Sequence, residues 1–467
     1  MKRARGQKRG VALVMVLGAI TVLTVFLTDL QQQTSAELSA ALAERDSLRA
    51  EYYARSAVNL ARLLIALEPT VRRTVAPLLA MLGSAPPQIP VWEFSDMVLG
   101  PYFNDPKSAS GLGLPNVDLA TAKNIGLSGG GRFELTIVDE DSKINVNAAA
   151  RSDPTSELRF GRQLLGLIDS PQYDPLFQGR DADNQFSDRA TVCGALVDWA
   201  DFDEQTFACD PRATGPVATG VEDNFYQTIG LPYRRKNAAL DSLEELRLVR
   251  GMSDDFWSTF VDPDPDDPHK RILTVWGQGT VNVNTANAQT LWALACGGAP
   301  EARLCNDPLQ AQAFLMSLSM MKSVIQNAPL FGTPNDFIAF MGGGGMLGPF
   351  IFGPLVEPIK FKVPQEVAKT ISTESKIFSI YGTGIVPGYR RETRVRVHAV
   401  VDFRTAPPIP AGFGGAYVSS TSGSGAPLPA TIPTPSMPLS GSTMGPGGLP
   451  SVMQPSMAGT IIYFRTE

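Results

Sequence analysis

The chain has few of the residues on which most metal centres and nucleophilic enzymes depend: 2 histidines and 4 cysteines among 467 residues. So few histidines leave almost no material for a Ser-His-Asp triad or a His-rich metal centre. The cysteines fall into two sequence-local pairs. In an oxidising compartment we expect disulfides Cys193–Cys209 and Cys296–Cys305, one of three possible connectivities. A thiolate metal site is the alternative, but no Cys-x-x-Cys spacing and no nearby histidine supports it.

Charge is absent from one long stretch, Val11 to Thr28, which as a helix would cross most of a bilayer. A basic leader precedes this stretch and places the N-terminus in the cytoplasm and the bulk of the chain across the membrane. Without the five basic leader residues, 35 Lys and Arg face 46 Asp and Glu, a formal charge of −11 instead of −6. Such an acidic chain argues against a nucleic-acid surface.

Neither proline nor glycine interrupts residues 31–67, which are rich in good helix formers. We therefore predict one helix over 11–68, with 11–28 in the membrane and Pro69 as its end. At about 1.5 Å per residue this helix is roughly 85 Å long. Its outer half is amphipathic, the pattern of a helix embedded on one side of a globular head.

Two ordinary interpretations compete for this N-terminal region. Ala41-Leu42-Ala43 fits the cleavage pattern of a secretory signal peptide, but it lies more than ten residues beyond the apolar run. A simple single-span anchor has the same hydropathy. The remainder of the chain has to decide between these alternatives.

A basic leader that ends in Gly10, followed directly by an apolar helix from Val11, resembles the class III signal of type IV pilins and pseudopilins. The resemblance implies cleavage after Gly10 by a prepilin peptidase and N-methylation of Val11. Most members carry Glu as the fifth residue after the cut, to neutralise the terminal amine of the subunit ahead of it. This chain has Met15 there. A subunit with nothing ahead would leave such a carboxylate unpaired in the membrane, which is costly, so Met15 suggests a place at the filament tip.

Two further motifs extend the resemblance. Residues 131–138 alternate as a strand and lead into the acidic turn and Lys-Ile-Asn-Val-Asn sequence of 139–147. This combination resembles a signature of the pseudopilin K family of type II secretion systems. The sequence of 279–287 repeats the Asn-Val-Asn element, so the two copies frame an inserted region of roughly 150–280. In that family a large helical domain interrupts the pilin-like sheet.

The insert contains a dense group of carboxylates in loop-forming sequence. Crowded carboxylates repel one another unless they gain counterions, and oxygen-rich loops suit Ca²⁺ better than Zn²⁺. An ordinary solvated loop is the alternative, but the resemblance implies calcium in the helical domain. The predicted ligands are Asp198, Asp201, Asp203, Glu222 and Asp223. Weaker candidates are Asp181, Asp183 and Asp188.

Residues 241–257 have the pattern of a helix-hairpin-helix that turns at Gly251, with a second copy starting near Pro329. Such hairpins can bind DNA backbones. The acidic residues around this one and the overall charge disfavour nucleic acid, so we expect a packing module. The hairpin nevertheless leaves a DNA-binding uptake protein as an alternative function. A hydrolase built on the acidic cluster is another alternative.

The C-terminal part returns to strands at 377–386 and 391–403, an antiparallel hairpin. Residues 406–459 are dominated by Pro, Gly and Ser and are expected to be a disordered insertion. A final strand follows at 460–465.

These observations and the family resemblance together predict an α+β protein: a pilin-like long N-terminal helix with an antiparallel sheet, plus a large inserted all-α domain of the SAM-like, helix-hairpin-helix type. The expected divisions are 1–10 leader, 11–68 long helix, 69–149 first part of the head, 150–280 inserted helical domain, 281–405 second helical segment and C-terminal sheet, 406–459 insertion and 460–467 final strand.

The resemblance implies a minor pseudopilin and not an enzyme. It would cap the tip and help start the pseudopilus that drives exoprotein export through the outer membrane. One span would anchor it in the bacterial inner membrane, with the C-terminal bulk in the periplasm. The implied partners are minor pseudopilins I and J, the major pseudopilin, the prepilin peptidase, the inner-membrane assembly platform, the secretin and exoproteins, with no nucleic acid. A minor pilin of a type IV pilus is the nearest alternative.

Overall fold

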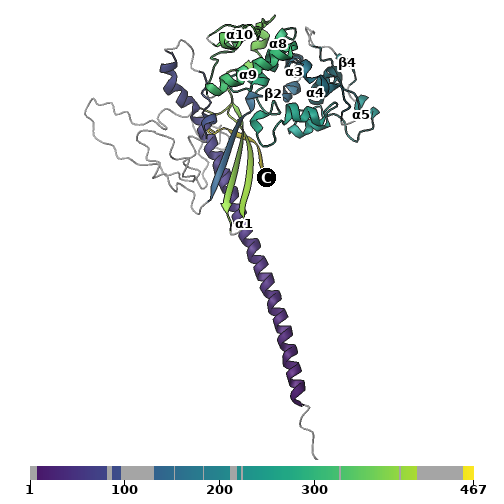
Figure 1. Cartoon of the computed structure of the whole chain (residues 1–467), viewed down its shortest axis with the longest axis vertical. Coiled ribbons are helices and arrows are strands. Elements are labelled where there is room, and N and C mark those ends of the chain that lie inside the picture. Colours follow the sequence, from purple (N-terminus) through teal and green to yellow (C-terminus); the bar gives the residue numbers. More distant parts are fainter. Residues whose placement is uncertain are drawn as a thin grey trace, which may run out of the picture.

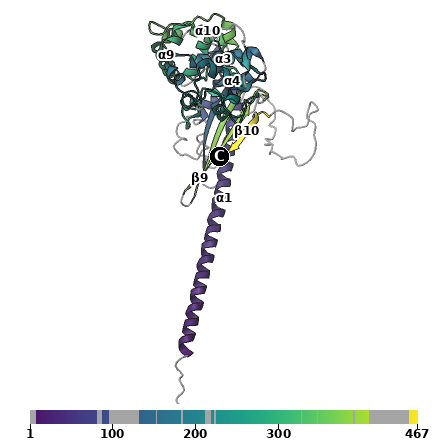
Figure 2. The same ribbon diagram turned by 90° about the vertical axis from the view of Figure 1, so that its right-hand side faces the viewer.

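The computed structural model describes residues 8–80, 87–95, 131–151, 153–181, 184–210, 218–221, 224–325, 328–345, 347–388, 391–407 and 456–467. A long helix carries a four-stranded sheet on its upper half, and a mass of helices lies beyond the end of the sheet (Figure 1). The view at right angles shows the same succession of helix, sheet and helical mass (Figure 2). Most of the predicted insertion at 406–459 lies outside the described residues.

Helix α1 (Lys8–Ala80) is continuous and its first part stands free of the head. An 18-residue window near its N-terminus has a mean hydropathy of 2.6 and is not buried, so this helix is long and apolar enough to cross a membrane. The free part ends where Asp46 and Ala50 become buried against the head. One helix thus provides both an apolar rod and a side of the globular head.

The predicted end of this helix at Pro69 is wrong, since α1 continues through Pro69 and Pro77 to Ala80. A proline removes one backbone donor and crowds the preceding turn, but here a side-chain pair spans the weakened turn. Arg72 donates to both carboxylate oxygens of Glu68 at 2.9 and 3.1 Å. Because Glu68 is buried, this pair holds the helix on both sides of Pro69.

The sheet has the antiparallel order β1-β8-β9-β10. Its strands are β1 (Arg132–Asp139), β8 (Ile377–Pro387), β9 (Glu392–Asp402) and β10 (Thr460–Thr466), which confirms the strands expected from sequence. Small residues of α1, Ala50 and Ala54 among them, pack on it fully buried. At Gly384 a Cβ atom would lie 1.8 Å from the Ala50 carbonyl oxygen, so only glycine permits this close approach.

The first helical unit lies between two short parallel strands, β2 (Ile144–Asn145) and β5 (Leu273–Thr274). Its α-helices are α3 (Pro154–Ile168), α4 (Arg189–Ala200), α5 (Asn224–Thr228) and α6 (Asp254–Phe256). Its other elements are η5 (Val146–Arg151), η6 (Pro171–Phe177), β3 (Gln205–Phe207), β4 (Ala218–Val221), η7 (Leu243–Leu248), η8 (Trp257–Val261) and η9 (Pro268–Lys270). The predicted hairpin is η7 and α6, joined through Gly251 at φ 82°.

The second helical unit is framed in the same way by β6 (Val281–Asn282) and β7 (Ile371–Ser372), which also pair in parallel. Between them lie α7 (Ala288–Gly298), α8 (Arg303–Asn306), α9 (Pro308–Val324), α10 (Pro334–Met341), α11 (Gly348–Ile351) and α12 (Pro364–Ala368). Two single turns, η1 (Val91–Phe94) and η4 (Glu140–Ser142), lie outside both units.

Each unit starts with the same asparagine arrangement, which explains the repeated motif in the sequence. The side-chain oxygen of Asn145 accepts from the backbone N–H of Asn147, and Asn282 does the same for Asn284. The side chain of Asn147 then accepts from the N–H of Leu240 and donates to its carbonyl oxygen. The side chain of Asn284 does the same with the N–H and the carbonyl oxygen of Phe331. The motif therefore ties the start of the first unit to the chain just ahead of η7, and the start of the second unit to the chain just ahead of α10.

Candidate functional site

The predicted processing site lies on the free end of α1. Val11 and Met15 are 60% and 72% exposed, and apart from the neighbouring backbone of the helix no described atom lies within 4 Å of a Cβ atom built on Gly10. Residues 1–7 of the leader lie outside the described residues. The Gly10–Val11 junction therefore stands on an exposed apolar helix, free of contact with the head.

The described part of the acidic cluster is built by the end of α4. This helix places Asp198 in its last turn and ends at Asp201, and both are buried, at 7% and 2% exposed. Asp198 Oδ1 accepts from the Phe207 N–H at 2.7 Å, which ties the helix to β3. Arg235, also buried, donates to the Asp198 carbonyl oxygen and lies 3.7 Å from Asp201 Oδ1. Asp203 is exposed and accepts from the N–H of Gln205.

Burial and mutual repulsion perturb these carboxyl groups strongly. Burial, with a smaller contribution from Asp201, raises the pKa of Asp198 to about 8. Burial, Asp203 and Glu157 raise the pKa of Asp201 to about 7. Glu157 on α3 has its own pKa raised by burial and by Asp203. The surroundings therefore disfavour the ionised form of these carboxyl groups, and near neutral pH Asp198 is mostly protonated.

The structure brings only some of the predicted calcium ligands together. Glu222, Asp223 and Asp183 lie outside the described residues, and among those described no group of three or more His, Cys, Asp or Glu side chains has the geometry of a metal site. Asp188 caps the N-terminus of α4, and Asp181 accepts from Ser187 within its own loop. Both therefore have structural roles.

Glu157 is a member of the cluster that the sequence did not reveal. It lies about forty residues before Asp198, on α3, and no spacing rule links the two. Its position would have been accessible only from the packing of α3 against α4. The side-chain oxygen Oδ1 of Asp201 is buried and has no hydrogen-bond partner in the described structure, so the cluster contains an orphaned acceptor.

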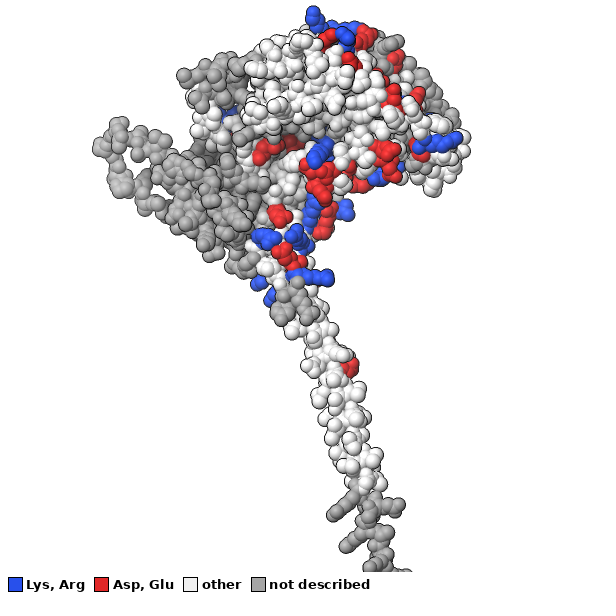
Figure 3. Space-filling model, viewed as in Figure 1, with Lys and Arg blue, Asp and Glu red and all other residues white. Residues whose placement is uncertain are grey.

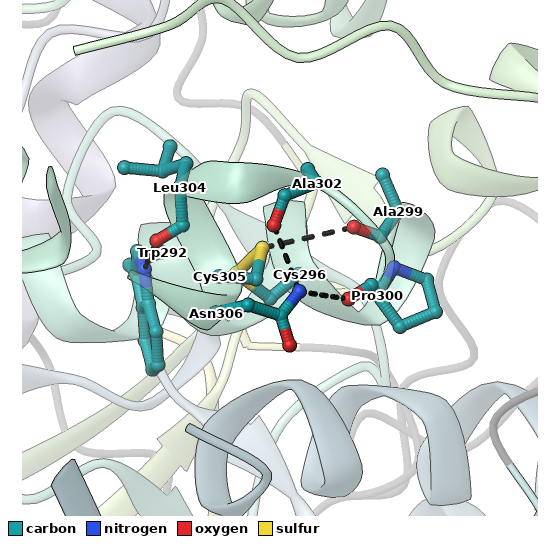
Figure 4. Close-up of a disulfide and its surroundings, with 8 residues drawn as sticks. All are labelled: Trp292, Cys296, Ala299, Pro300, Ala302, Leu304, Cys305 and Asn306. Atoms are coloured by element: carbon teal, nitrogen blue, oxygen red, sulfur yellow. Dashed lines mark hydrogen bonds between the residues drawn. A yellow bond between two sulfur atoms is a disulfide. The ribbon is translucent and has the colours of Figure 1, made fainter. Parts of the chain in front are cut away.

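The four cysteines form the two sequence-local pairs, Cys193–Cys209 in the first unit and Cys296–Cys305 in the second. Figure 4 shows the second pair, which joins α7 to α8. Asn306 closes the same turn by donating to the carbonyl oxygens of Pro300 and Ala302 at 2.8 and 2.9 Å. No cysteine of the described residues is free.

The acidic turn after β1 connects the sheet to both helical units. Asp141 accepts from the backbone N–H groups of Gln278, Lys376 and Ile377 at 2.7 to 3.1 Å. Asp139 accepts from the hydroxyl of Ser375, and burial raises its pKa to about 8. These carboxyl groups are held by hydrogen bonds from several segments, so this motif is a structural junction.

The hairpin of η7 and α6 offers no basic surface. Arg247 is engaged by Asp254 at 3.0 Å and lies over the Trp257 ring. In the view of Figure 3, acidic and basic side chains interleave along the lower edge of the head without a broad basic face. A phosphate backbone would meet repulsion at this hairpin, in keeping with a packing role.

The comparison with protein families finds a match within the first unit. Residues 142–260 match the model of the family described as type II secretion system (T2SS), protein K. This part of the chain is therefore similar to a type II secretion system protein K domain. The match starts in η4 and ends in η8, so the protein K domain corresponds to most of the first helical unit.

Two known proteins are similar to parts of the chain. Type II secretion system protein K of Pectobacterium carotovorum subsp. carotovorum is 27% identical over 149 residues, which are 31% of this chain and 35% of that protein. The matched part thus spans about a third of the relative's length. A chain in the crystal structure of the GspK-GspI-GspJ complex from the enterotoxigenic Escherichia coli Type 2 Secretion System has a TM-score of 0.38 and 17% identity, over 79% of this chain and 94% of that chain.

Proposed function

We propose that this protein is a minor pseudopilin of a type II secretion system, with a structural and not a catalytic role. The match of residues 142–260 to the protein K family carries this proposal. The exposed apolar half of α1 supports it, because a helix that is apolar and unburied needs lipid or neighbouring helices around it. We place the anchor in the bacterial inner membrane and the head in the periplasm.

We further propose that the protein caps the tip of the pseudopilus and helps to start its assembly. Met15 supports this place, since it leaves no carboxylate to bind a terminal amine of a subunit ahead. The helical units extend beyond the end of the sheet, on the side away from the free end of α1 (Figure 1). Minor pseudopilins I and J are the proposed partners, as in the complex named for the structural relative. The major pseudopilin, the assembly platform, the secretin and exoproteins are the further proposed contacts.

Mass spectrometry of the N-terminal peptide after co-expression with a prepilin peptidase tests the proposed class directly. We expect a chain that starts at N-methylated Val11, and a Gly10→Leu variant that stays uncut. Secretion of exoproteins from a deletion strain should return with the parent gene and not with the G10L gene. An intact N-terminus, or a start near Glu44, would overturn the proposal.

We also propose that the acidic cluster binds Ca²⁺. The buried oxygen of Asp201, the raised pKa values of Asp198 and Asp201 and the oxygen chemistry of the group fit a hard divalent cation. Asp198 and Asp201 would hold the ion, with Asp203, Glu222 and Asp223 as the further proposed ligands. The ion would neutralise charge that Arg235 offsets only in part.

Thermal unfolding of the full chain in nanodiscs, with calcium and with a chelator, tests this second proposal. We expect calcium to raise the Tm, and Mg²⁺ to do so less, because Mg²⁺ releases its waters reluctantly. The Asp201→Asn variant should lose the response, while Asp254→Asn, an exposed residue of the same unit, should keep it. A Tm that ignores calcium, or a D201N variant that responds like the parent, would contradict the site.

A further inference from the structure

A cavity of about 330 Å³ lies between the two helical units, and neither the processing site nor the acidic cluster includes it. Its walls come from α3 of the first unit and from the end of α7, the following loop and α12 of the second. Beside the cavity, α3 and α7 touch closely: a Cβ atom on Gly297 would lie 2.5 Å from the Arg162 carbonyl oxygen. The backbones of the two helices are therefore in close contact at the edge of the cavity.

Two buried donors on α3 line this cavity and lack acceptors. The side-chain nitrogen Nε2 of Gln163, a residue only 5% exposed, has no hydrogen-bond partner in the described structure, and neither has Nε of Arg159. The two residues are four positions apart, so they share one face of the helix. Buried donors of this kind are normally satisfied by protein, water or ligand, so this face is prepared for an acceptor.

The rim of the cavity limits the charge of that acceptor. Glu366 approaches Arg159 from one side at 3.5 Å, and Lys362 pairs with Glu301 at 2.8 Å on the other. With Arg162, the lining holds three cationic and two anionic side chains, a formal net charge of +1 that one carboxylate balances and a polyanion such as phosphate or a tricarboxylate exceeds. A single carboxylate with an uncharged body fits better, because Leu294 and Val367 give the walls apolar surface.

We propose that this cavity is a binding site for a monocarboxylate, with Gln163 and Arg159 as its two anchoring donors. The size of the cavity is at the small end for ligand sites and suits either the C-terminus of a peptide with small side chains or a free short carboxylic acid. The site uses residues of both helical units. A bound ligand therefore bridges the units and favours their present arrangement. This inference does not depend on the proposed role in secretion.

Calorimetric titration of the full chain in nanodiscs tests the site with three probes: N-acetyl-trialanine, its C-terminal amide and isobutyrate. We expect the tripeptide acid to bind with a submillimolar Kd and the amide at least about tenfold more weakly, the loss of one charge-assisted hydrogen bond. Isobutyrate separates the two sources. If it binds as tightly as the peptide, the ligand is a free acid, and if it binds more weakly, the ligand is a peptide terminus.

Two variants and a control assign the binding to this cavity. Gln163→Met keeps the shape of the side chain but removes the donor. Arg159→Gln changes a side chain that is 28% exposed, so the second variant tests the site even if the first unfolds. Each substitution should weaken the binding of the tripeptide acid by about tenfold. Arg303→Gln, which lies on the second unit and pairs with Glu357, should bind as the parent does. Equal binding of acid and amide, unchanged binding by R159Q, or no binding of any probe would overturn the proposal.

Discussion

The two helical units share one frame but differ in what they bury. Both begin with an asparagine turn, close on a parallel pair of short strands and contain one disulfide. The first unit buries acidic groups, Asp198 and Asp201, around Arg235. The second buries one base, Lys322, whose Nζ donates to the carbonyl oxygens of Asn284 and Ala286. An equivalent frame thus buries a cluster of carboxyl groups in one copy and an amine in the other.

This difference separates structure from function within the repeat. The Asn-x-Asn turns satisfy backbone groups in both units, so their recurrence reflects the needs of the fold. The acidic group occurs in one unit only, where no shared structural need explains it. We therefore look for function in the loops of the first unit and in the junction between units, and not in the repeated motif.

The largest effect should follow removal of a frame asparagine. Asn284→Ala removes three hydrogen bonds from a side chain 2% exposed, and we expect a loss of stability on the order of 3 kcal/mol. Asn147→Ala should cost less, about 2 kcal/mol, because Asn147 is half-buried and water can replace part of its bonding. Hydrogen exchange measured for each unit should show loosening mainly in the mutated unit.

The exposed Asn59 of α1 provides the control, since Asn59→Ala should change the exchange of neither unit. If N147A loosened the second unit as much as the first, the two units would be one cooperative block, and the comparison between them would lose its basis.

The disulfides should contribute nearly equal amounts to the two units. They close loops with sequence separations of 16 and 9, and loop entropy depends only on the logarithm of length. We expect the double alanine variants C193A/C209A and C296A/C305A to lose about 3 kcal/mol each in urea unfolding. Controls are the single variants, which break the same bonds. If the losses of unfolding free energy in the two double variants differed by several kcal/mol, native contacts, and not loop closure, would determine how much each disulfide stabilises the protein.

The sequence alone was sufficient to predict the helices and strands that have a clear periodic pattern. The strands of the sheet, the long helix and the hairpin at Gly251 follow from alternation, helix propensity and glycine. The continuation of α1 beyond Pro69 did not follow, because the Arg72–Glu68 pair that supports it depends on the burial of Glu68 against the head. A proline in the sequence predicts a helix end from local structure alone, whereas the contacts that let the helix continue past it come from the tertiary fold.

The candidate sites were predictable only in part. Asp198 and Asp201 stood out by crowding in the sequence, yet Glu157 joined them through helix packing. The paired donors Arg159 and Gln163 gave no signal, since arginine and glutamine on a helix are usually solvated. Their lack of acceptors depends on how α7 and α12 close over α3, which no local pattern encodes.

Opposite buried charges predict opposite responses to pH. Burial lowers the pKa of Lys322 to about 8, below its unfolded value, so the unfolded state holds the proton longer and stability rises as pH increases from about 8 to 10.5. Asp198 has a folded pKa of about 8, above its unfolded value, so in chelator stability falls as pH rises from about 4 to 8. We expect changes on the order of 2 kcal/mol in each window.

Urea unfolding across these two pH ranges measures both responses. Lys322→Met should flatten the alkaline response and Asp198→Asn the acidic one, the latter while keeping an acceptor for the Phe207 N–H. Calcium should reduce the acidic response if the cluster binds it. Responses of the same sign in both units would show that Lys322 and Asp198 do not govern them.

The smallest expected difference concerns the first helix of each unit. Asp153 caps α3 by accepting from the Thr155 N–H, and Asn287 caps α7 by accepting from the Thr290 N–H at 2.7 Å. Asp153→Ala and Asn287→Ala should each cost about 1 kcal/mol, the usual value of an N-cap. The costs should add in the double variant, because each cap holds only its own first turn.

Asp153→Asn serves as the matched control, since asparagine caps as well as aspartate and should leave the free energy of unfolding within a few tenths of a kcal/mol of the parent. A loss in D153N equal to that in D153A would show that the charge of Asp153, and not its hydrogen bond, stabilises α3. A double variant that lost clearly more than the sum would show that fraying spreads through the contact at Gly297. The two units would then be coupled through the helices that form the carboxylate cavity.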